Sequence, residues 1–247
     1  MNYGLFDWAA ERYDLHTPPH HYQHDHRFVL EELLDVPAGG RVLDVGCGTG
    51  GFLELLQRET EMEAFGIDAS EAMVRIARRK IGKARVEVVR MQNLKEKESY
   101  DALISLSWSF NYCVSFAEAR AVLARFAAAL TPGGKIILQV AHAPNATGCL
   151  LEDCEIGPNG LADDILFLYR FNCIGGENMT LQADYVYASR SLNELLHETH
   201  QLNAADALRV AELAGEVGFE EIQIYDSWQK KRLTGGLSPF IVARRRA

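Results

Sequence analysis

The sequence predicts an α/β fold in which seven strands form a mostly parallel sheet with helices on both faces. Three observations indicate it. Short apolar runs of the kind found in buried parallel strands alternate with helical patterns between residues 41 and 140. A glycine-rich turn, residues 46–51, joins the first apolar run to the first helical pattern. Two last apolar runs, residues 221–225 and 240–243, have no helix between them, which predicts an antiparallel final strand.

Length, charge and cysteine usage limit the class of protein. A chain of 247 residues corresponds to one large domain or to a domain with an insertion. The net charge of -9 argues against a nucleic-acid partner, and no apolar run approaches the roughly 18–20 residues that span a membrane. The early acids Asp7 and Glu11 argue against a signal peptide. Five cysteines without a C-x-x-C pair predict free thiols in a cytoplasmic protein. The oligomeric state is left open, with a homodimer as one option.

Residues 1–38 are expected to form a helical lid that precedes the sheet. Pro18 interrupts the helical pattern, and Trp8 and Tyr13 give its first part an apolar side. Five histidines lie here, and His20 and His24 would share one face of a helix. We interpret them as polar residues of the lid and predict no metal site, because no cysteine accompanies them and they precede the core. The histidines are His16, His20, His21, His24 and His26.

The glycine turn after the first strand suits two kinds of ligand. Gly46, Gly48 and Gly51 fit the dinucleotide spacing G-x-G-x-x-G, and glycine lets the backbone turn sharply beneath a ligand. Asp44 stands two residues before the turn. Its carboxylate would repel a pyrophosphate but would attract a ligand that carries an ammonium group. S-adenosylmethionine carries an ammonium and a sulfonium and has no phosphate, so Asp44 favours it over a nicotinamide dinucleotide.

Two stretches resemble one protein family. VLDVGCGTG, residues 42–50, resembles the first motif of class I methyltransferases, and LTPGGKIIL, residues 130–138, is similar to the same family. The resemblance covers about residues 36–142 and 204–243. It implies a Rossmann-like sheet, S-adenosylmethionine as cofactor and transfer of its methyl group. The cofactor-binding residues expected on this basis are Asp44, Gly46, Cys47, Gly48, Gly50, Asp68, Ala69, Met73, Met91, Gln92, Asn93 and Leu106.

Asp68 ends the second expected strand, residues 64–68, and lies 22 positions after Gly46. This matches the spacing of about 20 residues at which an acid accepts the ribose hydroxyls of a nucleotide. Capping the following helix is the alternative role for Asp68. Because Ser70 can provide that cap, Asp68 is left for the ligand.

The third expected strand, residues 85–89, departs from the family pattern at its end. The family often has an acid there, which holds the adenine amino group, whereas this chain has Arg90. We therefore expect Met91 and Gln92 to contact the adenine through the backbone or the side-chain amide.

The fourth strand is expected at residues 100–105. In the family, the end of this strand faces the transferred methyl group. The loop that follows, residues 106–112, is rich in serine and aromatic residues, which suits an organic acceptor, with ordinary packing as the alternative for its rings. The loop lacks the N/D-P-P-Y/F pattern of methyltransferases that act on nucleic acid or on glutamine amides. The fifth strand is expected at residues 135–140. The expected acceptor-binding residues are Ser107, Trp108, Asn111, Tyr112 and His142.

The alternation of strand and helix stops at residue 143. Residues 165–175 and 178–188 are strand-like, with a hairpin turn at Gly175-Gly176 between them, and residues 192–202 are a candidate third strand. Small-molecule N-methyltransferases often carry an antiparallel cover at this point of the chain. His197 and His200 are expected to pack in this sheet or to meet solvent.

The expected division of the chain follows from these elements. Residues 143–203 form an antiparallel insertion that covers the acceptor pocket. Residues 39–142 and 204–247 form the core that binds the cofactor.

The predicted reaction is methyl transfer from S-adenosylmethionine to a small organic acceptor by in-line displacement, with an amine nitrogen preferred. His142, after the fifth strand, is the first candidate for a general base, and Tyr13 is the second. One alternative is an O-methyltransferase with a hydroxyl or carboxylate acceptor. Another is a cofactor-binding protein without transferase activity. The identity of the acceptor is not predicted.

Overall fold

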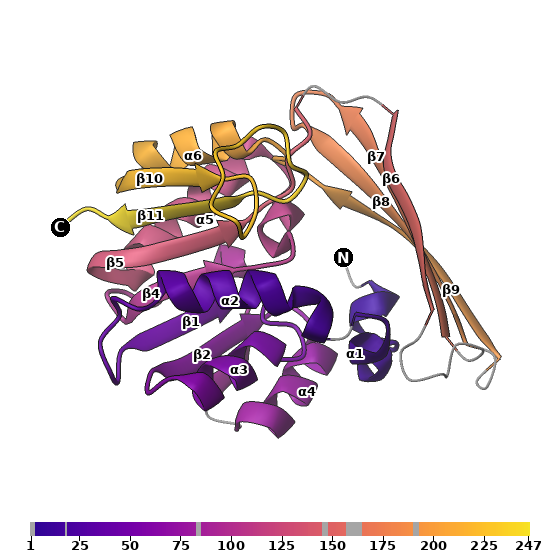
Figure 1. The fold of residues 1–247 in the computed structure, drawn as a ribbon, viewed down its shortest axis with the longest axis horizontal. Helices are drawn as coiled ribbons and strands as arrows, with labels where there is room; N and C mark the ends of the chain where they lie inside the picture. The colour runs from indigo at the N-terminus through magenta and orange to yellow at the C-terminus, as the bar shows by residue number, and fades with distance from the viewer. Residues whose placement is uncertain (1–2, 18, 83–84, 145–147, 157–164, 190–192) are drawn as a thin grey trace.

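The computed structural model of the chain describes residues 3–17, 19–82, 85–144, 148–156, 165–189 and 193–247. One sheet has the strand order β10-β11-β5-β4-β1-β2-β3 (Figure 1). Only β11 runs against its neighbours, because it pairs antiparallel with both β5 and β10. This confirms the predicted Rossmann-like class. The strands are β1 (Arg41–Val45), β2 (Glu63–Asp68), β3 (Val86–Val88), β4 (Tyr100–Ser105), β5 (Leu130–Gln139), β10 (Phe219–Tyr225) and β11 (Phe240–Arg245).

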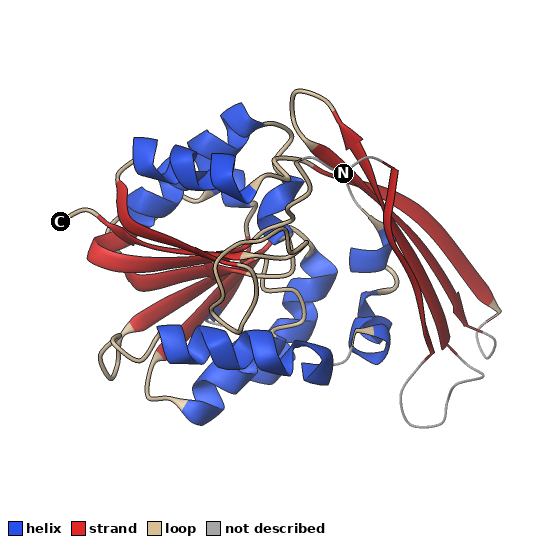
Figure 2. Ribbon diagram, turned by 45° about the horizontal axis from the view of Figure 1, so that its top comes forward, coloured by secondary structure: helices blue, strands red, loops and turns tan. Residues whose placement is uncertain are grey.

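Helices cover both faces of this sheet (Figure 2). Successive residues of a strand point to opposite faces, and β1 shows the consequence. Leu43 and Val45 pack into the core that α5 and α6 cover, whereas Val42 packs into the core beneath α2, α3 and α4. The main helices are α2 (Gln23–Glu32), α3 (Gly51–Glu59), α4 (Glu71–Ile81), α5 (Phe116–Ala129) and α6 (Ala207–Glu216). None of the described helices is long and apolar enough to cross a membrane.

A second sheet of four antiparallel strands stands apart from the first (Figures 1 and 2). Between the two sheets lie the described residues from 3 to 22, which we call the N-terminal segment. The hairpin at Gly175-Gly176 is present, with both glycines at positive φ. We expected three strands. The strand that sequence reasoning missed, β6, lies at an edge and pairs only with β7, so it needs no regular apolar pattern. The strands are β6 (Gly148–Ile156), β7 (Ile165–Gly175), β8 (Thr180–Ser189) and β9 (Glu194–Leu202).

The N-terminal residues divide into two parts. The described residues from 3 to 22 lie between the two sheets (Figure 1). Helix α2 instead packs on the seven-stranded sheet, where Phe28 and Val29 are buried in the same core as Val42. Helix α2, which the expected lid of residues 1–38 includes, thus packs with the core of the seven-stranded sheet. The short elements of the first part are η1 (Gly4–Phe6), η2 (Ala10–Arg12), α1 (Tyr13–His16) and η3 (Pro19–Tyr22).

Asn111, in the turn η6 (Ser109–Tyr112) after β4, joins the two sheets. Its side-chain amide donates to the carbonyl oxygens of Asn203, at 2.8 Å, and Ala204, at 3.2 Å. Its side-chain oxygen accepts from the backbone N–H of Ala141 at 2.8 Å. Asn111 is fully buried, so these groups have no water to replace a lost partner. The residue fixes the end of β9 against the end of β5.

We expect Asn111→Asp to lower the free energy of unfolding by about 2–4 kcal/mol, because a carboxylate cannot donate to the two carbonyl oxygens and is itself buried. Urea unfolding of the variant and of the wild type measures the difference. Asn93→Asp, at an exposed position, is the matched control. A loss below about 0.5 kcal/mol, the usual range for a surface substitution, would contradict this role of Asn111.

Candidate functional site

A cavity of about 1050 Å³ lies where the carboxyl ends of β1, β2 and β4 meet the N-terminal segment and the four-stranded sheet. In a doubly wound sheet this edge is where ligands bind. Most of the expected site residues line the cavity. Those that do are Tyr13, Asp44, Gly46, Cys47, Gly48, Asp68, Ala69, Met73, Met91, Gln92, Leu106, Ser107, Trp108 and Tyr112.

Asp44 is the buried acid at the end of β1. Its side chain is 3% exposed, and its Oδ1 atom has no hydrogen-bond partner among the described residues. Burial, together with the nearby charge of Asp68, raises the pKa of the Asp44 carboxyl to about 8. A buried carboxylate in this position is stabilised by a cation, which the described protein residues do not supply.

Asp68 lies at the end of β2, facing the glycine turn. Its Oδ2 accepts the backbone N–H of Gly48 at 2.9 Å, and its Oδ1 accepts that of Ser70 at 2.8 Å. Ser70 caps α4 as expected, because its hydroxyl accepts the N–H of Met73 at 3.1 Å. Asp68 is thus not as free as expected, since it also holds the turn. Each carboxylate oxygen keeps a second lone pair that can accept a ligand hydroxyl.

Three of the four glycines in the turn, Gly46, Gly48 and Gly50, have different environments. A Cβ on Gly46, whose φ is +78°, would lie 2.5 Å from the Cβ of Ser109, so only glycine fits there. A Cβ on Gly48 would meet no atom within 4 Å, which leaves its backbone open to a ligand. Gly50 packs against Ala77 of α4 and is not part of the cavity lining. Its expected contact with the cofactor is therefore not supported.

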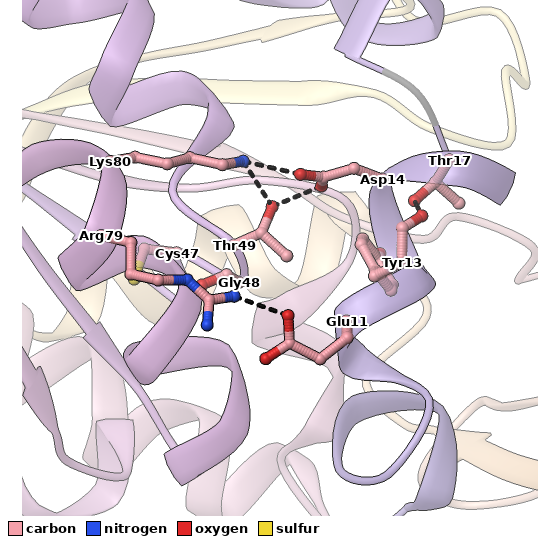
Figure 3. Close-up of polar contacts among 9 residues, drawn as sticks. All are labelled: Glu11, Tyr13, Asp14, Thr17, Cys47, Gly48, Thr49, Arg79 and Lys80. Atoms are coloured by element: carbon pink, nitrogen blue, oxygen red, sulfur yellow. Dashed lines mark hydrogen bonds and ion pairs between the residues drawn. The ribbon is translucent and has the colours of Figure 1, made fainter.

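The N-terminal segment is tied to the glycine turn by a polar cluster (Figure 3). Asp14 of α1 accepts the hydroxyl of Thr49 at 2.6 Å and pairs with the ammonium of Lys80 at 2.7 Å. Glu11 pairs with Arg79 of α4 at 2.6 Å. We call Asp14, Thr49 and Lys80 the clasp. It holds α1 over the turn that Asp44 and Asp68 flank.

The other end of the cavity is aromatic. Phe6 and Tyr13 of the N-terminal segment, Trp108 and Tyr112 after β4, and the four-stranded sheet all contribute side chains to it. The lining residues of that sheet include Phe167, Tyr169, Phe171 and Tyr185. Burial raises the pKa of the Tyr13 hydroxyl, with the charges of Asp68 and Asp14 adding to the shift, so Tyr13 stays protonated at neutral pH.

His142 has a different position from the one expected. Its ring is buried beside the start of α6, and Nδ1 accepts the backbone N–H of Ala207 at 3.0 Å. Burial lowers the pKa of His142. The described lining of the cavity does not include it. His142 therefore caps α6, and its place outside the described lining argues against the expected role as a general base.

Two other expected residues also lie outside the described lining. Asn111 is the buried link between the sheets, so its polar groups are already used. Asn93 is exposed at the end of the turn η5 (Met91–Asn93), whereas Met91 and Gln92 face the cavity beside Arg90. Among the described residues, no group of three or more histidine, cysteine or acidic side chains is placed to hold a metal ion.

Residues 42–134 match the family described as "Methyltransferase domain". This stretch contains Asp44, the glycine turn, Asp68 and the loop after β4.

Residues 42–134 are thus a methyltransferase domain.

Curated relatives and solved structures resemble the chain over different lengths. The chain is 32% identical over 103 residues to dTDP-3-amino-3,4,6-trideoxy-alpha-D-glucopyranose N,N-dimethyltransferase of Streptomyces venezuelae, over 42% of this chain and 43% of the relative. It is 29% identical over 140 residues to trans-aconitate 2-methyltransferase of Variovorax paradoxus (strain S110), over 55% and 51%. Each match spans about half of the relative's length. DesVI of Streptomyces venezuelae superposes with a TM-score of 0.76, at 19% identity, over 97% of this chain and 98% of that chain, which shows a shared fold.

The site of this methyltransferase domain fits S-adenosylmethionine. The unpartnered oxygen of Asp44 can accept from its ammonium group, and Asp68 can accept from its ribose hydroxyls. The open space beside the Gly48 backbone leaves room for a ligand at the turn. Cys47 also lines the cavity, but burial raises the pKa of its thiol well above the usual range, so it is no nucleophile.

Sequence reasoning missed Asp14 and Glu198 as site residues, and it expected His200 only to pack in the sheet or to meet solvent. Asp14, Glu198 and His200 belong to the N-terminal segment and to β9, which no family motif covers. The only sequence signal for Asp14 is that it is an acid next to Tyr13. The only signal for Glu198 is that it precedes a histidine by two residues on an expected strand. Their partners are far away in the chain, so no local pattern identifies them.

We expect Asp44→Asn to weaken the binding of S-adenosylmethionine by about 10- to 100-fold, because a hydrogen bond to a charged group contributes about 1.5–3 kcal/mol. Since the pKa of Asp44 is raised to about 8, its carboxyl is largely protonated at pH 7, and a bound cation favours the ionised form. Binding to the wild type at pH 7 should therefore release protons. The number of protons released should be smaller at pH 9, and smaller in Asp44→Asn than in the wild type at pH 7.

Titration calorimetry in buffers of different ionisation enthalpy measures both the affinity and the protons released. Glu220→Gln, an exposed carboxylate of β10, is the matched control. Equal affinity and equal proton release in Asp44→Asn and the wild type would remove Asp44 from the ligand contacts.

We expect Asp14→Leu to loosen the N-terminal segment, because it removes both contacts of the clasp. Amide hydrogen exchange in residues 3–17 should become about 5- to 30-fold faster, which corresponds to about 1–2 kcal/mol of local stability. Exchange measured by mass spectrometry on the full chain tests this. Arg58→Met, which breaks an exposed pair with Glu59, should leave the segment unchanged. Unchanged exchange in Asp14→Leu would show that the clasp does not hold the segment.

Proposed function

We propose that this chain is an S-adenosylmethionine-dependent methyltransferase that methylates the nitrogen of a small amine. The charge of the cavity is the observation that carries the proposal. Among its described lining residues, Arg90 is the only lysine or arginine, against seven acids. Lys80, which is not among the described lining residues, forms an ion pair with one of these acids, Asp14, and so offsets its charge. A cavity of this charge attracts cations and repels carboxylates. The acids are Asp7, Asp14, Asp25, Asp44, Asp68, Glu71 and Glu118.

The curated relatives support methyl transfer, but they are named for different kinds of acceptor, so the acceptor class is argued from the charge of the cavity. The Streptomyces venezuelae relative is named as an N,N-dimethyltransferase of an amino sugar, and the Variovorax relative is named for trans-aconitate, an acid. The acidic cavity favours the first kind of acceptor. The aromatic rings at the other end support it too, because ring faces attract ammonium groups.

In this proposal, separate residues bind the cofactor and position the acceptor. When bound, S-adenosylmethionine supplies a methyl group attached to a positively charged sulfur. Asp44 holds the ammonium end of the cofactor and Asp68 holds its ribose. The rings of Tyr13 and Tyr112 position the acceptor nitrogen, while the clasp keeps the N-terminal segment closed over both ligands. Alignment and exclusion of water are the main contributions of the protein to an in-line displacement.

We further propose functional roles for the parts of the chain. Residues 39–142 and 204–247, with α2, bind the cofactor. Residues 143–203 cover the acceptor, and the residues from 3 to 22 act as the lid. The described cysteines Cys47, Cys113, Cys149 and Cys173 are free thiols, which supports a reducing compartment such as the cytoplasm.

A hydroxyl acceptor is the second candidate, because the Tyr112 hydroxyl lies 2.6 Å from a ring nitrogen of His200. A hydroxyl needs a base more than an amine that has already lost its proton. A cofactor-binding protein without turnover would show affinity for S-adenosylmethionine but no transfer.

The test is turnover of the full chain with S-adenosylmethionine labelled in its methyl group, against primary amines, amino sugars, phenols, alcohols and carboxylic acids of similar size. We expect label in the amines and, for the same carbon skeleton, at least tenfold less in the carboxylic acid. Labelling of the acids in preference to the amines would contradict the proposal. Binding of NADH but not of S-adenosylmethionine would contradict the whole assignment.

A further inference from the structure

Tyr112, His200 and Glu198 form a hydrogen-bonded row at the aromatic end of the cavity. The Tyr112 hydroxyl lies 2.6 Å from Nδ1 of His200, and Nε2 of His200 lies 3.3 Å from Oε2 of Glu198. Tyr112 lines the cavity, whereas His200 is fully buried behind it. The row therefore leads from the cavity wall into the four-stranded sheet.

The partners fix the direction of these hydrogen bonds. Glu198 accepts the backbone N–H groups of Gly4 and Leu5, the latter at 2.9 Å, as an ionised carboxylate does. Because a carboxylate only accepts, Nε2 of His200 carries the proton and Nδ1 is bare. The Tyr112 hydroxyl then donates to Nδ1, which leaves the lone pairs of its oxygen for a donor in the cavity.

The surroundings keep His200 neutral at rest. Tyr3 stacks on its ring with centroids 3.6 Å apart, and the ring of Tyr185 meets it edge-on at 4.9 Å. Burial lowers the pKa of His200, while Glu198 acts in the opposite direction. The titratable groups that face Tyr112 are Tyr3, Tyr13, Tyr185 and Glu198, and burial raises the pKa of Tyr112 well above its usual range. A neutral imidazole beside a carboxylate can accept a proton.

An acidic cavity creates a need for such a base. An amine that enters as an ammonium ion is held in that form by the surrounding carboxylates, because opposite charges favour the charged state. An ammonium nitrogen has no lone pair and cannot attack a methyl group. The cavity that selects the acceptor would therefore also inactivate it, unless a nearby group removes the proton.

We propose that Tyr112, with His200 and Glu198 behind it, removes this proton from the bound ammonium. The inference rests on the proposed function, since it concerns the acceptor of that reaction. Tyr112 is the catalytic residue because it contacts the acceptor. His200 and Glu198 are positioning residues that act through it.

The protons and electrons balance within the row. The acceptor's N–H bond breaks and its proton moves to the Tyr112 oxygen, as the Tyr112 proton moves to Nδ1 of His200. His200 becomes an imidazolium beside the Glu198 carboxylate, and the freed electron pair stays on nitrogen. That pair then forms the bond to the methyl carbon as the bond from this carbon to sulfur breaks. The proton on His200 leaves to solvent when the products leave.

Two variants, Tyr112→Phe and His200→Gln, test the row in the full chain. At pH 7 we expect kcat to fall by about 10²- to 10⁴-fold in each, the usual contribution of a general base, with the affinity for S-adenosylmethionine unchanged. The loss in kcat/KM should shrink by about tenfold per pH unit between pH 7 and 9, because hydroxide then deprotonates the amine. His197→Gln, at an exposed position of the same strand, is the control.

A second readout needs no turnover. The ¹⁵N spectrum of the ligand-free wild type should show His200 with a bare Nδ1 and a protonated Nε2, and Tyr112→Phe should shift the Nδ1 signal. A protonated Nδ1 would overturn the proposal, as would a loss of kcat that is below threefold or does not change with pH. If the wild type binds S-adenosylmethionine but methylates no amine, the proposed function fails, whatever the spectrum shows of the row.

Discussion

The unpaired carboxylate of Asp44 is the constraint on which the rest of the site depends. The parallel strands β1 and β2 end side by side, and this brings Asp44 and Asp68 to the same edge of the sheet. Two buried carboxyl groups that lie close together raise each other's pKa unless a cation lies between them. Asp68 is stabilised by two backbone N–H groups of the protein, whereas the Oδ1 of Asp44 has no partner among the described residues. The fold thus maintains a buried carboxyl group that is largely protonated at pH 7, and a cationic ligand would stabilise its ionised form.

The sequence was informative where a residue's role is set by its own strand and the turn that follows. Asp44, Gly46, Asp68 and Ser70 were found this way, because a parallel strand places its carboxyl end at the ligand edge whatever the rest of the chain does. The fold class followed from the same regularity.

The failures share one physical cause, which is contact between distant segments. His142 does follow β5, but its ring turns toward the N–H of Ala207, 65 residues away. Asn111 lies in the expected loop, yet its amide donates to the carbonyl oxygens of Asn203 and Ala204, just after β9. His200 was expected to pack or to meet solvent; it is fully buried, and its partner Tyr112 is 88 residues distant. Periodicity along one strand cannot identify such partners.

Strand β7 places two kinds of surface on one stretch of backbone. Phe167, Tyr169 and Phe171 line the cavity, whereas the alternate residues Leu166 and Leu168 are 37% and 39% exposed on the opposite face. Three alternate positions of the strand therefore line the cavity, and none of these side chains enters the core beneath the seven-stranded sheet. Single substitutions at these three positions can consequently reshape the cavity wall without altering the packing of the seven-stranded sheet. A slip of the strand by one residue, in contrast, would remove all three rings from the cavity wall at once and would put leucine and polar side chains in their places.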